Sequence, residues 1–228
     1  MLEGYGQVIL QGIGVTVELA LSALIFAVLI GLGGAAARLS RFTWLRAIGT
    51  AYTTIVRGIP DLVLMLLIFY GLQIALNQFT HSLHLDHIDI APLPAGILTL
   101  GFIYGAYFTE TFRGAVLSVP IGQREAAIAY GMTPWQCFIR ITFPLMMRFA
   151  LPAIGNNWQV ILKATALVSI LGLEELVKAT QLAGKSTWQP LFFALIAGAV
   201  YLLFTIISQL VLAALMRFYS AGVKKVTL

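Results

Sequence analysis

Long apolar runs place the strongest constraint on how this chain can fold. Five of them follow one another, at roughly residues 8–37, 51–76, 93–117, 149–173 and 190–216. Because the hydrocarbon core of a bilayer is about 30 Å thick, a helix needs about 20 apolar residues to cross it. Hydrophobic residues make up 60% of the 228 positions and charged residues only 10%, which excludes a typical soluble globular domain. The sequence therefore predicts an all-α, polytopic membrane protein whose five transmembrane helices form a single domain over residues 1–228.

Basic residues indicate how these helices are oriented. They gather after the first run, between the third and fourth runs and after the fifth run, as Arg38, Arg41, Arg46, Arg113, Arg124, Arg140, Arg148, Arg217, Lys224 and Lys225. Because cytoplasmic loops are enriched in Lys and Arg, we expect the N-terminus outside and the C-terminus in the cytoplasm. The same sorting accounts for the net charge of +5, so we expect membrane lipid and no nucleic acid as a partner. Glu3, with no Lys or Arg before the first run, argues against a signal peptide.

A polar interruption from Gln123 to Pro144 predicts two short helices that meet at Gly131. Gly131 is suited to end the first helix, because glycine adopts the left-handed conformation of a helix C-cap without steric cost. Thr133 and Gln136 have the spacing of a capping box at the start of the second helix. Pro144 is expected to end that helix.

The same interruption carries a family signature. Its positions are Glu125, Ala126, Ala127, Gly131, Ile141 and Pro144. They are spaced as in the E-A-A-x3-G-x9-I-x-L-P signature of bacterial ATP-binding-cassette importer permeases, which this chain resembles, with Phe143 in the place of Leu. The resemblance implies a type I importer permease fold in which the loop at about residues 120–145 is the coupling helix that docks on a cytoplasmic ATPase.

Further stretches resemble the polar amino-acid branch of these permeases. Residues 57–60, 105–114 and 119–123 are similar to that branch, and residues 155–163 and 178–188 resemble Q-type subunits of histidine and lysine/arginine/ornithine permeases. That resemblance implies a non-catalytic subunit of the bacterial inner membrane for basic or polar amino acids. It also implies a homologous M-type permease subunit, an ATPase dimer and a periplasmic amino-acid-binding protein as partners. ATP and magnesium would then bind the ATPase, and no cofactor would bind this chain.

Polar residues within the apolar runs are candidates for the substrate path. They are Glu18, Asn156, Asn157, Gln159 and Lys163. Such groups are costly in lipid and usually face a bundle interior or a water-filled path. We leave open whether they line that path or bind neighbouring helices. Asn156, Gln159 and Lys163 should share one helix face, because they are spaced at i, i+3 and i+7.

Other charged residues allow simpler interpretations. Glu110 and Arg113, at i and i+3, predict a helical ion pair. Arg57 is expected at the membrane interface, with Pro60 beginning or kinking the second membrane helix. The outward acids Asp86, Asp89, Glu174 and Glu175 fit the steering of a cationic substrate, and equally the charge sorting that orients the helices.

Alternative functions have weaker support in the sequence. Residues 184–187, Gly-Lys-Ser-Thr, lack the earlier glycine of a phosphate-binding loop, since position 179 is Ala. His81, His84 and His87 fit a solvated loop better than a metal site. An ion-coupled secondary transporter or a channel remains the alternative function, although no repeated halves are evident. A structural membrane scaffold is a third possibility.

Overall fold

The computed structural model describes residues 4–219 as a set of helices joined by short loops. Lys224 and Lys225 of the predicted basic tail lie outside the described residues. The described elements are α1 (Gly6–Arg38), α2 (Thr43–Gly58), α3 (Asp61–Ser82), α4 (Pro92–Leu117), α5 (Ile121–Ala129), α6 (Pro134–Cys137), the π-helical turn η1 (Phe138–Thr142), α7 (Phe143–Ala164), the 3₁₀ segment η2 (Thr165–Leu171), α8 (Leu176–Ser186) and α9 (Pro190–Tyr219). The all-α prediction is confirmed.

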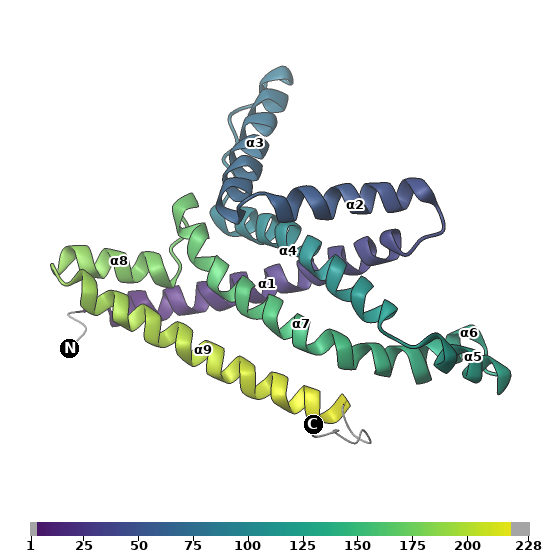
Figure 1. Cartoon of the computed structure of the whole chain (residues 1–228). Helices are drawn as coiled ribbons and strands as arrows, with labels where there is room; N and C mark the ends of the chain where they lie inside the picture. The colour runs from purple at the N-terminus through teal and green to yellow at the C-terminus, as the bar shows by residue number, and fades with distance from the viewer. Residues whose placement is uncertain (1–3, 220–228) are drawn as a thin grey trace.

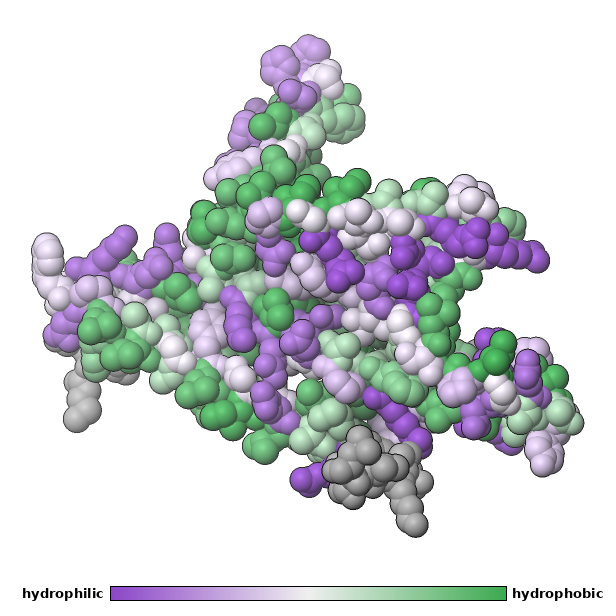
Figure 2. Space-filling view, viewed as in Figure 1, coloured by the Kyte–Doolittle hydropathy of each residue, from purple (hydrophilic) through white to green (hydrophobic). Residues whose placement is uncertain are grey.

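The long helices form a bundle with distinct ends. Figure 1 shows α8 near the N-terminus at one end, and α5 and α6 at the opposite end. α3 projects away from the bundle on the side of α2. On the face shown in Figure 2, hydrophilic residues gather between α2 and α7, whereas the base of α3 is hydrophobic. The face between the two ends of the molecule thus carries both polar and apolar surface.

Small residues allow the backbones of α1 and α4 to pack closely against each other. On α1, Ala23, Ala27, Gly31 and Ala35 are buried at intervals of four residues, which places them on one face. On α4, Gly101, Gly105 and Thr109 repeat at the same interval and are also buried. A Cβ atom at Gly105 would lie 2.6 Å from Cγ2 of Ile30 on α1. This pattern is the one by which membrane helices pack closely, because bulkier side chains would hold the backbones apart.

The second predicted membrane helix is broken in two. We expected a span from about residue 51 to 76, with Pro60 beginning or kinking it. The structure places an extended Ile59, with φ −109° and ψ 139°, between α2 and α3. A residue before proline avoids the helical region, because the proline ring clashes with it there. Arg57 thus lies in the last turn of α2, about 21 Å along the axis from Thr43.

The fourth predicted membrane helix is longer than expected. Residues 134–171 form an uninterrupted helical segment of 38 residues, which joins α6, η1, α7 and η2. The expectation that Pro144 ends a helix is therefore wrong. The carbonyl with which its ring would clash belongs to Arg140, within the widened π-helical turn at Phe138–Thr142, so the helix accommodates the proline.

Four helical segments within residues 4–219 are long and apolar enough to cross a membrane. They are Gly6–Arg38, Asp61–Ser82, Pro134–Leu171 and Pro190–Tyr219. α4, expected as the third span, is long enough with 26 residues but does not meet the criterion of apolar composition. It carries Glu110 and Arg113 and lies at the centre of the bundle, where most of its residues are shielded by other helices. The composition of a central helix is thus set by packing rather than by lipid.

We expect Gly31→Leu to destabilise the chain, because a Cβ at this position would lie 3.0 Å from the backbone carbonyl carbon of Phe108 and 3.2 Å from the amide nitrogen of Thr109. Backbone atoms cannot move aside as a flexible side chain does, so overpacking should cost about 1–3 kcal/mol. The measurement is the melting temperature of the purified chain in detergent.

Gly33→Leu is the matched control for this substitution. It lies on the same helix, and a Cβ at Gly33 meets no atom within 4 Å. A similar loss of melting temperature in both variants would contradict the role assigned to the close approach of α1 and α4.

Candidate functional site

The segment at the tip of the bundle is built by local capping. We define the coupling segment as α5 and α6 with their connection, residues 121–137. At the end of α5, the amide of Gly131 donates to the carbonyl of Ile128 at 2.9 Å, and the amide of Met132 donates to the carbonyl of Ala127 at 3.1 Å. This is a Schellman motif, and Gly131 has the φ of +81° that it requires. The predicted helix end at Gly131 is confirmed.

A capping box starts the second half of the coupling segment. The amide of Gln136 donates to Oγ1 of Thr133 at 3.3 Å, and the amide of Thr133 donates to Oε1 of Gln136 at 2.9 Å. Pro134 occupies the first turn of α6, where a backbone N–H would have no partner within the helix, so its absence costs no hydrogen bond. The turn between the two helices is thus fixed on both sides by its own sequence.

The signature residues lie on different faces of the coupling segment and the helix that continues from it. Glu125, Ala126 and Gly131 are exposed, Ala127 is buried, and Ile141 and Pro144 are half-buried. Two large aromatic side chains that sequence reasoning missed lie beside them, with Tyr130 89% and Trp135 68% exposed. Exposed aromatic side chains at the tip of a bundle are typical of a protein interface. Their presence in an otherwise polar loop was the signal available in the sequence.

The candidate path residues separate into two groups. Asn156 and Lys163 are exposed and Gln159 is half-buried on one face of α7, as their spacing predicted. Asn157 is buried, and its Nδ2 donates to Oγ1 of Thr111 on α4 at 3.1 Å. Of the two interpretations left open, binding between helices therefore holds for Asn157. The α7 face formed by Asn156, Gln159 and Lys163 remains available to a substrate.

Glu18 does not join this face. It is exposed on α1, on the same side as Leu21, Ile25 and Leu29, which are also exposed. It lines neither the cavity where α7, α8 and α9 meet nor the cavity where α1, α2 and α4 meet. The structure thus gives Glu18 no contact with the other candidate path residues.

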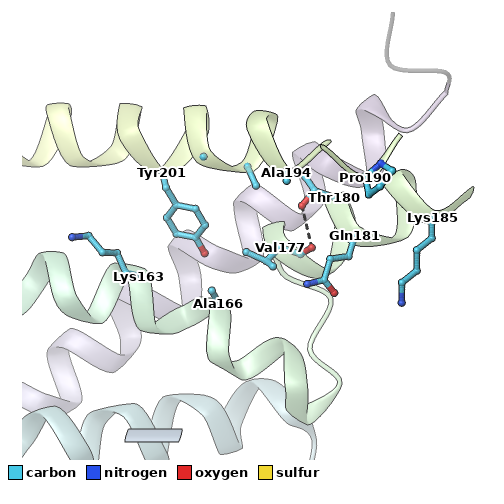
Figure 3. A pocket seen from close by; sticks show the side chains of 11 residues that line it. Lys163, Ala166, Val177, Thr180, Gln181, Lys185, Pro190, Ala194 and Tyr201 are labelled. Atoms are coloured by element: carbon cyan, nitrogen blue, oxygen red, sulfur yellow. Dashed lines mark hydrogen bonds between the residues drawn. The ribbon is translucent and has the colours of Figure 1, made fainter. Parts of the chain in front are cut away.

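The first of these cavities has a volume of about 550 Å³ and opens between α7, α8 and α9, and we call it the outer cavity (Figure 3). Its polar lining comes from Lys163, Thr180, Gln181, Lys185 and Tyr201, and the rest of its wall is apolar. In Figure 3 the two lysines lie at opposite ends of the outer cavity, with the Tyr201 ring between α7 and α9. The outer cavity thus shares Lys163 with the α7 face.

Glu175 closes the bundle beside the outer cavity. Its side chain is fully buried and accepts hydrogen bonds from the amides of Val177 at 2.9 Å and Lys178 at 3.0 Å, so it caps α8. Oε2 also lies 3.4 Å from the hydroxyls of Thr16 on α1 and Tyr201 on α9. Burial raises the pKa of this carboxyl above its usual range. Of the two interpretations given to Glu175, the steering of a cationic substrate does not hold, because the carboxylate is enclosed by three helices.

The second cavity, of about 410 Å³, lies where α1, α2 and α4 meet, and we call it the inner cavity. It is lined by Arg38, Thr50, Thr53, Thr54, Arg57, Gly58, Tyr107 and Glu110. The predicted pair is confirmed, since Nη2 of Arg113 lies 2.7 Å from Oε2 of Glu110. Arg38 is a further partner that sequence reasoning missed, at 3.2 Å from Oε1 of Glu110. The guanidinium of Arg57 lies over the ring of Tyr107, 5.2 Å from its centroid.

The histidines at residues 81–87 and the Gly-Lys-Ser-Thr stretch at residues 184–187 are two further features that the sequence singled out. In the described part of the chain, no group of three or more His, Cys, Asp or Glu side chains could hold a metal ion. His87 instead lies 3.3 Å from Asp89 and 2.7 Å from Nδ2 of Asn77. Gly184, Lys185 and Ser186 belong to the helix α8, not to a phosphate-binding loop.

Comparisons with known proteins show which family the chain belongs to. Over the full length of both proteins, the chain is 66% identical to the histidine/lysine/arginine/ornithine transport system permease protein HisQ of Salmonella typhimurium strain LT2. It is 63% identical to the protein of the same description from Escherichia coli strain K12, again over both full lengths. A crystal structure of an amino acid ABC transporter with histidines has a TM-score of 0.79 and 28% sequence identity, and covers 93% of this chain and 94% of that chain.

The family match extends over most of the helices. Residues 19–220 match the family described as binding-protein-dependent transport system inner membrane component. The resemblance drawn from the spacing of Glu125, Gly131 and Pro144 is thereby confirmed. The chain belongs to the family of inner membrane components of binding-protein-dependent transport systems.

Proposed function

We propose that the chain is the membrane-spanning permease subunit of an ATP-driven importer for histidine, lysine, arginine, ornithine or related amino acids. The transport of histidine, lysine, arginine and ornithine for which its relatives are named supports this substrate class. The observation that carries the proposal is the coupling segment, which presents Glu125 and Ala126 with the exposed Tyr130 and Trp135 at the tip of the bundle. A partner ATPase would dock there and supply ATP and magnesium.

The proposed arrangement has five membrane crossings, with the N-terminus in the periplasm and the C-terminus in the cytoplasm. α1, α4, α7 with η2, and α9 would supply four crossings, and the broken pair α2 and α3 the other. The coupling segment then lies in the cytoplasm and α8 lies at the periplasmic end, where a binding protein would deliver the amino acid. A homologous M-type subunit would pack beside this chain and complete the path.

The uninterrupted helix from Pro134 to Leu171 links the two ends of this arrangement. It begins within the coupling segment and carries the α7 face formed by Asn156, Gln159 and Lys163. Movement of the docked ATPase would therefore act on the α7 face without an intervening loop. We propose that this face lines the substrate path, because its polar groups are exposed or half-buried at a depth where contact with lipid would be costly.

The test of the proposed function is co-purification followed by ATPase activity. The chain is isolated from membranes, and the captured complex is assayed with and without a liganded binding protein. We expect an ATPase and a second permease subunit to be captured, and the liganded binding protein to raise ATP turnover. A chain that purifies alone and transports amino acids in an ion gradient without ATP would contradict the proposal and favour the ion-coupled alternative.

We expect Gly131→Val to weaken ATPase association and transport while membrane insertion stays intact. The φ of +81° at Gly131 is unfavourable for a side chain with a Cβ, at a cost of about 1–2 kcal/mol, and more for a β-branched residue. The measurements are ATPase capture and transport rate. Gly131→Asn is the matched control, since Asn tolerates the left-handed conformation and should keep most of the capture. Equal losses in both variants would show that the backbone conformation is not the cause.

We expect Asn156→Leu and Gln159→Leu to lower the transport rate without changing ATPase capture. If each side chain binds a charged substrate in the transport step, losing that hydrogen bond removes about 1.5 kcal/mol or more, which is about 10-fold or more in rate. Asn157→Leu should instead lower the melting temperature, because it removes the bond to Thr111 on α4. Unchanged transport in the first two variants would remove the α7 face from the path.

A further inference from the structure

Arg57 lies at an unusual depth for a charged side chain. In the proposed orientation, α2 begins at the cytoplasmic surface, and Arg57 lies about 21 Å further along it. The hydrocarbon core is about 30 Å thick, so in that orientation Arg57 would lie within the core, deeper than the interface expected from the sequence. The break at Ile59 and Pro60 is the physical reason, because it ends α2 inside the bundle. A guanidinium at this depth requires an anion or a water-filled cavity.

The carboxylates of Asp61 on α3 and Glu110 on α4, the helices that follow α2, are already engaged. Glu110 takes both Arg38 and Arg113 as ion-pair partners. Asp61 accepts a hydrogen bond of 2.7 Å from the hydroxyl of Tyr104. Among residues 4–219, Arg57 makes no ion pair and its guanidinium contacts the ring of Tyr107. Its hydrogen-bond donors are therefore available to a ligand.

Thr54 adds a second unengaged donor on the same face of α2. It precedes Arg57 by three residues, so the two side chains are neighbours on the helix surface. The hydroxyl of Thr53 donates to the carbonyl of Gly49, and that of Thr50 donates to the carbonyl of Arg46. No hydrogen bond of the Thr54 hydroxyl is formed within the described part of the chain, and this side chain is exposed in the inner cavity.

The charges around the inner cavity favour an anionic group. Arg38, Arg57 and Arg113 are set against the single carboxylate of Glu110. A guanidinium fork with an adjacent hydroxyl matches the geometry of a carboxylate, which accepts hydrogen bonds on both oxygens. A cationic side chain would be repelled from the same place. The inner cavity is thus suited to the acidic end of an amino acid and not to a basic side chain.

We propose that the inner cavity binds the α-carboxylate of the amino acid in transit, through the guanidinium of Arg57 and the hydroxyl of Thr54. The inference rests on the proposed function and adds which end of the substrate this subunit recognises. Because the carboxylate is common to all α-amino acids, this chain would accept histidine, arginine and lysine alike. Selection by side chain would then be made by other components of the importer.

The test is equilibrium binding of arginine and of agmatine, which is arginine without its carboxylate, to the whole detergent-solubilised complex without binding protein. For the unsubstituted complex, we expect arginine to bind more tightly than agmatine. Arg57→Gln should weaken arginine binding about 10- to 100-fold, the range for a lost hydrogen bond to a charged group, and leave agmatine binding unchanged. Thr54→Val should weaken arginine binding by a smaller factor in the same direction.

Controls separate this inference from misfolding and from the proposed function. Arg46→Gln removes a charge from the same helix outside the inner cavity, and should change neither affinity. If Arg57→Gln prevents assembly, Thr54→Val alone decides the question. Equal affinity of the unsubstituted complex for the two ligands, no arginine binding at all, or equal losses for both ligands in the variants would overturn the inference. ATP turnover raised by the liganded binding protein would still support the importer in each of these cases.

Discussion

The close approach of α1 and α4 is the contact on which the other helices depend. In lipid there is no hydrophobic driving force between helices, so association relies on packing and interhelical hydrogen bonds. The repeat of Ala27, Gly31 and Ala35 brings the two backbones together, and α4 then offers partners to its other neighbours. These bonds are Tyr52 to the carbonyl of Phe102, Tyr104 to Asp61, and Asn157 to Thr111. These three hydrogen bonds position α2, α3 and α7. All three are made to α4, which packs against α1 through small side chains.

Sequence reasoning succeeded where the determinants are local. The helix end at Gly131, the capping box of Thr133 and Gln136, and the pair of Glu110 and Arg113 each involve residues within one or two turns. Their spacing alone fixes which groups can meet. The common face of Asn156, Gln159 and Lys163 follows from helical periodicity in the same way. The helix boundaries of the coupling segment and the common side of the α7 residues could therefore be predicted without knowledge of any tertiary contact.

The remainder depends on contacts between residues far apart in the sequence. Arg38 reaches Glu110 because α1 and α4 cross, and nothing in the neighbourhood of either residue predicts it. Glu175 reads as a surface charge, yet it caps α8 and is enclosed by α1 and α9. Pro144 reads as a helix end because the π-helical turn before it has no sequence pattern that we recognised. Sequence also left undecided which of the adjacent Asn156 and Asn157 turns inward, since only the position of α4 distinguishes them.

The helix from Pro134 to Leu171 also has a mechanical consequence. At 1.5 Å per residue its 38 residues extend for about 57 Å, so it can act as a lever arm. A tilt of roughly 5° about one end would displace the other end by about 5 Å, a distance close to the diameter of an amino-acid side chain. A small rotation of a docked ATPase about the end at the coupling segment would thereby be enlarged into a displacement of the opposite end.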